Sequence, residues 1–132
     1  MEDALLIPAG ECDVILAHAV RDAPREACGL LVGAGGAVIR VAPTANADDS
    51  PTRYTVPPDA HLAGIRAARR DGLDVIGAYH SHPRSAADPS PTDTAEAFAG
   101  FVFVIAGLVP EPHVRAWHVV EGNFVELRIV RT

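Results

Sequence analysis

Two histidines and an aspartate stand at a spacing in the sequence that suits a metal site. They are His80, His82 and Asp93, with the aspartate eleven residues beyond the second histidine. Imidazole nitrogens and carboxylate oxygens are zinc ligands, and catalytic zinc sites keep three protein ligands and leave the fourth position for water. We therefore expect these three residues to bind a metal ion of this kind.

The residues around this triad predict the elements that must position it. The apolar segment 73–79 predicts a buried strand. Because residues i and i+2 of a strand point to the same face, His80 and His82 at its end should aim at one point. Ser90 and Asp93 predict the start of a helix, as N-cap and third residue of a capping box. Such a pair is more often a cap than a metal site, but one aspartate can fill both roles.

A hydrolytic metal site also needs a group that moves a proton, and Glu26 is the candidate. It directly precedes the apolar segment 27–33, which predicts a buried strand. A charged side chain at the start of a buried strand is energetically unfavourable unless it points to a polar site. A solvated residue at a strand end explains Glu26 equally well, so the residues alone leave the two interpretations even.

The remaining histidines and cysteines are weaker candidates for chemistry. His113 and His118 are five apart on a predicted strand and should face opposite sides. His18 and His61 lie on predicted helices without a partner in sequence. Cys28 could approach the metal site, but we expect a small buried core residue.

The pattern along the chain predicts a mixed sheet with helices packed on it. Gly35 and Gly36 predict the turn of a hairpin, and the last three strands should form a meander. Strands are predicted at residues 4–7, 28–33, 37–41, 73–79, 101–109, 114–120 and 124–130, and helices at 11–21, 57–71 and from Ser90 to Gly100.

Composition limits the class of protein. The 132 residues, 48% hydrophobic and 21% charged, predict one folded domain over residues 1–132. The net charge is −6 without a basic cluster, which argues against nucleic-acid binding. There is no apolar run long enough to span a membrane and no signal-peptide pattern. With only two cysteines, we expect buried thiols in a cytoplasmic protein.

Taken together, these residues resemble the JAMM (MPN+) zinc metalloprotease family, and in particular its small prokaryotic members. The family pattern is a glutamate, then His-x-His, seven residues, and Ser-x-x-Asp. Glu26 supplies the glutamate, His80 and His82 the pair, and Ser90 and Asp93 close the motif. The context of Glu26, the residue Asn46 and the segment from Arg53 to Pro57 are also similar to that family, so the resemblance covers nearly the whole chain.

The resemblance implies a fold, a cofactor and a role for each residue. The fold is a cytidine-deaminase-like α/β sandwich, a mixed β-sheet flanked by helices. His80, His82 and Asp93 would bind Zn²⁺ with water as fourth ligand, and Glu26 would be general base and then general acid. Ser90 would help to hold the oxyanion of the tetrahedral intermediate.

The resemblance also implies a substrate. This is a peptide or isopeptide bond after the C-terminal Gly-Gly of a ubiquitin-like or sulfur-carrier protein. Such a tail suits a narrow groove, and it could pair with an exposed strand edge. The loop from Asn46 to Tyr54 is the candidate groove wall. Two alternatives stay open: a zinc hydrolase of a small amide or cell-wall-type peptide, and a non-catalytic interaction module. The sequence does not identify the oligomeric state.

Overall fold

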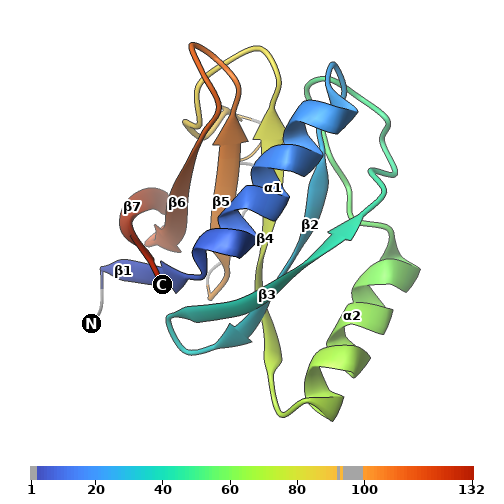
Figure 1. Ribbon diagram of the computed structural model, residues 1–132, viewed down its shortest axis with the longest axis vertical. Coiled ribbons are helices and arrows are strands. Elements are labelled where there is room, and N and C mark those ends of the chain that lie inside the picture. The colour runs from blue at the N-terminus through green and yellow to red at the C-terminus, as the bar shows by residue number, and fades with distance from the viewer. Residues whose placement is uncertain (1–2, 92, 94–99) are drawn as a thin grey trace.

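The computed structural model describes residues 3–91, 93 and 100–132, in which two helices pack against a sheet of strands (Figure 1). The predicted strands and the first two predicted helices are present, with boundaries that differ by a few residues. The strands are β1 (Ala4–Ile7), β2 (Cys28–Ala34), β3 (Ala37–Thr44), β4 (Asp74–His82), β5 (Val102–Gly107), β6 (His113–Val120) and β7 (Asn123–Arg131), and the helices are α1 (Ala9–Asp22) and α2 (Pro58–Arg70).

The strands form one mixed sheet that closes on itself in the order β1-β3-β2-β4-β5-β6-β7. The predicted β2–β3 hairpin is confirmed, with Gly35 in its turn at φ 58°, a conformation that favours glycine. The meander β5-β6-β7 is antiparallel, as predicted, whereas β4 and β5 run parallel. Closure was not predicted. It comes from the parallel pairing of β1 with β7, which joins strands from opposite ends of the chain.

The contact between β1 and β3 is short. The register pairs only Leu6 with Ala37, and the Leu6 amide donates to the Gly36 carbonyl at 2.9 Å. Further along β3, the Val41 amide donates instead to the Glu11 carboxylate of α1, at 2.7 Å. A helix side chain thus takes the place of a neighbouring strand where β1 has diverged.

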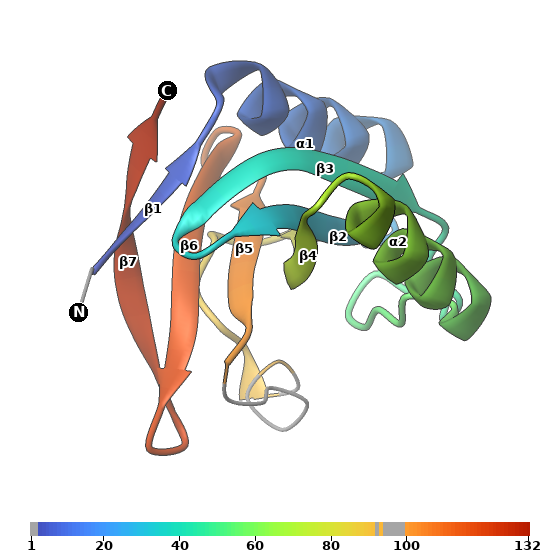
Figure 2. The ribbon, with the colours of Figure 1, turned by 90° about the horizontal axis from the view of Figure 1, so that it is seen from below.

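The two helices cover opposite faces of β2 and β4 (Figure 2). On one face, α1 packs Ile15 and Ala19 into the main core with Leu31 and Tyr79. On the other face, α2 lies so close to β2 that a Cβ at Gly64 would sit 2.4 Å from a methyl carbon of Leu30. The short distance between α2 and the sheet on this face is therefore possible because Gly64 has no side chain.

These two faces decide where the candidate site lies. Strand β4 runs three residues further than predicted, so that His80 and His82 belong to the strand itself rather than to the residues after it. Tyr79 enters the core beneath α1. Because side chains alternate along a strand, His80 and His82 lie on the opposite face. The candidate site is therefore on the side of the sheet away from α1.

The predicted third helix lies partly outside the described residues. Pro91 and Asp93 are helical, and the prediction for the remainder falls mostly on residues that the structure does not describe. Among the described residues, neither helix has the length and apolar character needed to cross a membrane.

Candidate metal centre

The structure brings His80, His82 and Asp93 together. The Nε2 atom of His80 lies 3.0 Å from Oδ1 of Asp93, and the Nε2 atom of His82 lies 3.0 Å from Oδ2. One potential ligand atom from each residue lies within 4.8 Å of the others. All three side chains are buried. Two imidazole nitrogens and a carboxylate thus converge on one point and could hold a metal ion.

The electrostatics of this cluster favour a charged carboxylate. Burial alone would raise the pKa of Asp93, but hydrogen bonds from His80 and His82 outweigh it and hold that pKa far below its ordinary value. Burial acts to lower the pKa of His82, yet the hydrogen bonds to Asp93 and to the Ala86 carbonyl raise it overall. The Asp93 carboxylate therefore carries a negative charge in the site. This charge can stabilise either protonated histidines or a bound cation.

The start of the helix after the loop places Asp93. The Ser90 amide donates to Oδ2 of Asp93 at 2.9 Å, and the Asp93 amide donates to Oγ of Ser90 at 3.2 Å. This is the reciprocal capping box that the sequence predicts. The same oxygen, Oδ2, faces His82. The cap therefore fixes the carboxylate that completes the cluster.

A backbone carbonyl sets the ring of His82. Nδ1 of His82 lies 3.0 Å from the Ala86 oxygen. A carbonyl can only accept, so Nδ1 carries the hydrogen and Nε2 is the nitrogen left for Asp93 or a metal. Histidine ligands usually donate their second N–H in this way, which orients the ring. This contact could not be predicted from the sequence, because no pattern marks Ala86.

Tyr54 packs directly on the cluster. Its ring stacks on that of His80, with centroids 4.3 Å apart and planes within 13°. Tyr54 also lines an apolar pocket between α2 and the sheet, together with Thr55, Val56 and Phe103 among others. The residue expected in a groove wall thus lies at the junction of that pocket and the histidines.

Glu26 is buried, at 3% exposure. The interpretation of Glu26 as a solvated strand-end residue is therefore wrong. It lines the same cleft as His82 and Ser90. Ser81, between the two histidines, holds the adjacent backbone: its Oγ accepts from the Ala27 amide at 2.8 Å. The carboxylate thus enters the site from the start of β2, which is tied to the end of β4.

Asn46 ties the loop after β3 to the same place. Its Nδ2 donates to the carbonyls of Glu26 at 3.1 Å and Arg53 at 2.9 Å. Its Oδ1 accepts from the amides of Asp48 and Thr55. One amide side chain therefore fixes the shape of the loop beside Glu26.

Two of the other histidines, His18 and His113, contact groups outside the cluster. His18 contacts the Tyr79 hydroxyl at 2.7 Å and Asp22 at 3.0 Å on the α1 face. His113 accepts a hydrogen bond from the Ala87 amide at 3.1 Å. Cys28 is fully buried with its thiol near Thr44 and Ala45, and burial raises its pKa. Its predicted place in the core is confirmed.

A mixed sheet with two helices and a buried His-x-His…Asp cluster is an α/β domain with a candidate metal centre. Residues 8–120 match the prokaryotic homologs of the JAB domain, and the chain is a member of that family. The resemblance noted in the sequence is confirmed.

Three curated relatives match most of the chain. The probable TtuB-protein conjugate cleaving protease of Thermus thermophilus is 39% identical, over 96% of this chain and 83% of that protein. The CysO-cysteine peptidase of Mycobacterium tuberculosis is 34% identical, over 92% and 87%. The desampylase of Haloferax volcanii is 33% identical, over 95% and 94%.

Solved structures share the fold. A protein from Desulfitobacterium hafniense has a TM-score of 0.87 at 30% identity, over 97% of this chain and 92% of that one. A JAB1/MPN domain protein from Archaeoglobus fulgidus has a TM-score of 0.63 at 22% identity, over 96% and 98%. A structure described as a JAMM metalloprotease-like zinc site in the proteasome and signalosome has a TM-score of 0.60 at 22% identity, over 97% and 99%. The mixed α/β fold implied by the resemblance is confirmed.

Proposed function

We propose that this protein is a zinc-dependent metallopeptidase that hydrolyses a peptide or isopeptide bond after the C-terminal Gly-Gly of a ubiquitin-like or sulfur-carrier protein. The convergence of His80, His82 and Asp93, with ligand atoms within 4.8 Å, carries this proposal. The relatives named for cleaving TtuB conjugates, for the CysO-cysteine peptidase activity and for desampylation support the class of substrate.

The donor set fits zinc. His80 and His82 would each supply Nε2 and Asp93 a carboxylate oxygen, and three such ligands leave a position open, as catalytic zinc sites do. Zinc bound there would supply Lewis acidity, which lowers the pKa of a water to about 7 and polarises a carbonyl. The stacked ring of Tyr54 and the Ala86 carbonyl would hold the two imidazoles in place.

Glu26 is the proposed proton carrier. It is buried beside His82 and Ser90 in one cleft. From there its carboxylate would take a proton from the attacking water and pass it to the leaving amine. Ser90 is the proposed donor to the oxyanion. Its Oγ accepts from the Asp93 amide, which fixes its position, and a preorganised donor needs a fixed position.

The proposed tail groove is walled by the loop from Asn46 to Tyr54. Because Asn46 holds this loop through both its amide nitrogen and its amide oxygen, the wall should be rigid. A Gly-Gly tail lets a backbone approach such a wall closely, and it could add to a strand edge by β-augmentation. We also propose a cytoplasmic site of action, in keeping with two buried cysteines that are not disulfide-bonded.

Tyr54→Ala tests this groove. The change removes the ring stacked on His80 and one wall of the apolar pocket. We expect cleavage of a carrier substrate by the zinc-saturated variant to weaken through a higher KM. The comparison of kcat and KM with Tyr54→Phe, which keeps the ring, is the measurement. Unchanged cleavage by the alanine variant would count strongly against the groove assignment.

The proposed function is tested by intact masses after incubation of the zinc-loaded protein with carriers extended beyond Gly-Gly. One set carries a single cysteine and the other an isopeptide-linked lysine, with Glu26→Gln as control. Loss of cysteine alone places the enzyme in sulfur metabolism, and release of the lysine conjugate makes it a deconjugating protease. A fully zinc-loaded protein that cleaves neither set contradicts the proposal and favours small-amide hydrolysis.

A further inference from the structure

A continuous chain of hydrogen bonds leads from the start of β6 to the ring of His82. The Glu111 carbonyl lies 2.7 Å from Nδ1 of His113. The Nε2 atom of His113 lies 3.1 Å from the Ala87 amide. The Ala86 carbonyl lies 3.0 Å from Nδ1 of His82. Two histidines, thirty-one residues apart in the sequence, are thus joined through one segment of the loop after β4.

Each donor and acceptor along this chain is determined. The Glu111 carbonyl can only accept, so Nδ1 of His113 carries the hydrogen, and its Nε2 accepts from the Ala87 amide. The N–H of Ala87 and the C=O of Ala86 belong to the same planar peptide group. Fixing the N–H by His113 therefore fixes the carbonyl that orients His82. Hydrogen bonds arranged in series also polarise one another, which strengthens the last one.

The same peptide segment is anchored from a second side. The indole N–H of Trp117 donates to the Ala87 carbonyl at 3.1 Å. Ala87 is fully buried and packs with Ile105 and Trp117. A Cβ at Gly107 would sit 2.5 Å from the Ala87 nitrogen. The loop therefore lies directly against the backbone of β5 and against side chains of β6.

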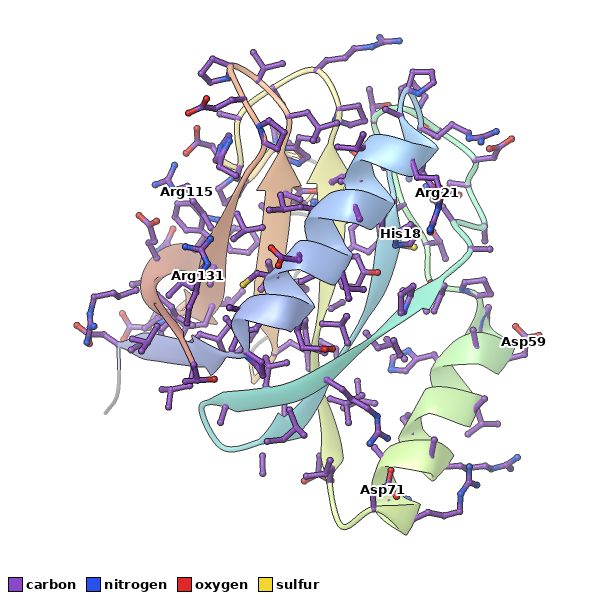
Figure 3. The ribbon with its side chains drawn as sticks, in the orientation of Figure 1. His18, Arg21, Asp59, Asp71, Arg115 and Arg131 are labelled. Atoms are coloured by element: carbon purple, nitrogen blue, oxygen red, sulfur yellow. The ribbon has the colours of Figure 1, made fainter. Side chains whose placement is uncertain are left out.

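A surface ion pair continues this anchoring outward. Arg115 of β6 donates to Asp88 of the loop and makes two hydrogen bonds of 2.8 Å to Glu126 of β7. Its guanidinium lies 4.7 Å from the centre of the Trp117 ring. In Figure 3, Arg115 is on the side of the molecule away from α2. Because Arg115 is partly exposed, this contact contributes less than the buried ones.

We propose that His113 is a positioning residue of the metal centre. It holds the peptide between Ala86 and Ala87 so that the Ala86 carbonyl turns Nε2 of His82 toward Asp93 and the metal. The proposal rests on the proposed function only for the identity of His82 as a ligand. His113 itself does not touch the metal, which agrees with its poor spacing as a ligand in the sequence.

The test compares two substitutions at His113 by their effect on metal binding. His113→Phe keeps the bulk of the ring and removes both hydrogen bonds, so Zn²⁺ affinity should fall about tenfold, the lower end of the range for residues that orient ligands. His113→Gln can still accept from the Ala87 amide and donate to the Glu111 carbonyl, so most of the affinity should return. Affinity is measured by competition with a chromophoric chelator, and the Co²⁺ absorption spectrum reports the ligand geometry.

Further variants keep the test decisive. His118→Phe changes a histidine of the same strand outside this chain of hydrogen bonds, and its metal affinity should match the wild type. Trp117→Phe removes the indole N–H together with part of the ring that packs on Ala87, and it should weaken metal binding by less than His113→Phe, because the Ala87 amide keeps its bond to His113. If His113→Phe does not fold, His113→Leu, which also removes both hydrogen bonds, decides: wild-type affinity and an unchanged Co²⁺ spectrum in that variant would overturn the proposal.

Other results separate a positioning role from a merely structural one. If the phenylalanine and glutamine variants at His113 lose affinity equally, in proportion to their loss of urea stability, the role is structural and the proposal is wrong. If the wild type binds metal but cleaves no carrier, the proposed function fails and the positioning proposal stands. If the wild type binds no metal, both fail.

Discussion

Strand β4 carries a buried histidine assembly on each face, and the two use similar side chains in different ways. On the α1 face, both ring nitrogens of His18 contact other groups of the protein. Nε2 lies 3.0 Å from Asp22, and Nδ1 lies 2.7 Å from the Tyr79 hydroxyl. Asp22 can only accept, so neutral His18 donates from Nε2 and accepts from Tyr79. Figure 3 labels this histidine on α1. The assembly ties the helix to the strand.

On the opposite face, nitrogens of two histidines point at one carboxylate. The Nε2 atoms of His80 and His82 each face a different oxygen of Asp93 at 3.0 Å. The two assemblies also differ in charge: burial lowers the pKa of His18, whereas contact with Asp93 raises that of His82. Convergence therefore distinguishes a candidate ligand set from a structural histidine, since burial and a carboxylate partner are common to both.

The largest expected effect separates the two aspartates. Asp93→Ala should reduce the metal content to near zero and cleavage to background, because it removes a ligand and leaves two buried imidazoles without their common partner. Asp22→Asn should keep the metal content of the wild type. Metal analysis after dialysis checks both. Equal metal loss in the two variants would break the distinction between the faces.

The next effect concerns the proton carrier. Glu26→Gln should lower kcat by about 10² to 10⁴, the usual contribution of a general acid–base group, while zinc content stays near that of the wild type. Steady-state kinetics on a cleavable carrier, with metal analysis of the same samples, is the measurement. A variant that retains wild-type kcat would remove Glu26 from the mechanism.

A smaller effect should appear on the α1 face alone. Tyr79→Phe leaves a buried His18 nitrogen without its donor, which should cost about 1–3 kcal/mol in the free energy of unfolding. Zinc affinity should not change. Urea unfolding measures the cost, and a double-mutant cycle with His18→Phe should recover part of it. Full additivity of the two substitutions would show that the Tyr79–His18 contact contributes nothing.

The smallest effect is a pH dependence of stability. The pKa of His18 is lowered by burial, with Asp22 opposing this shift. Between that lowered pKa and the unfolded value of about 6.5, the unfolded chain binds more protons than the folded one. Stability should therefore fall as pH drops below about 6.5. Urea midpoints of metal-free protein across this range should fall less in His18→Gln than in the wild type, and parallel profiles would contradict the assignment.

Local patterns were enough to predict most of what the cluster is built from. Alternation along a strand placed His80 and His82 on one face, and the capping pattern placed Asp93 on a helix start. Both rules act over a few residues, so a single sequence carries them. The burial of Glu26 decided between two interpretations that its sequence context left even, because burial depends on the segments folded around it.

Contacts between distant segments could not be predicted in the same way. Closure of the sheet depends on the pairing of β1 with β7. Neither strand has a sequence pattern from which its pairing partner could be predicted. The place of His113 was missed for a similar reason. Its partner is a backbone amide of Ala87, and every residue but proline offers one. The stacking of Tyr54 on His80 likewise joins a loop to a strand without a shared motif.

The hydrogen bond from the Val41 amide to Glu11 has a consequence for the behaviour of many copies in solution. A row of unsatisfied backbone groups on an outer strand is a template on which another chain can add. Where β1 leaves β3, the Glu11 carboxylate both occupies one such donor and brings a negative charge to a protein of net charge −6. We therefore expect this edge to be a poor template for a second copy, whose strand would have to displace the Glu11 carboxylate and approach its charge.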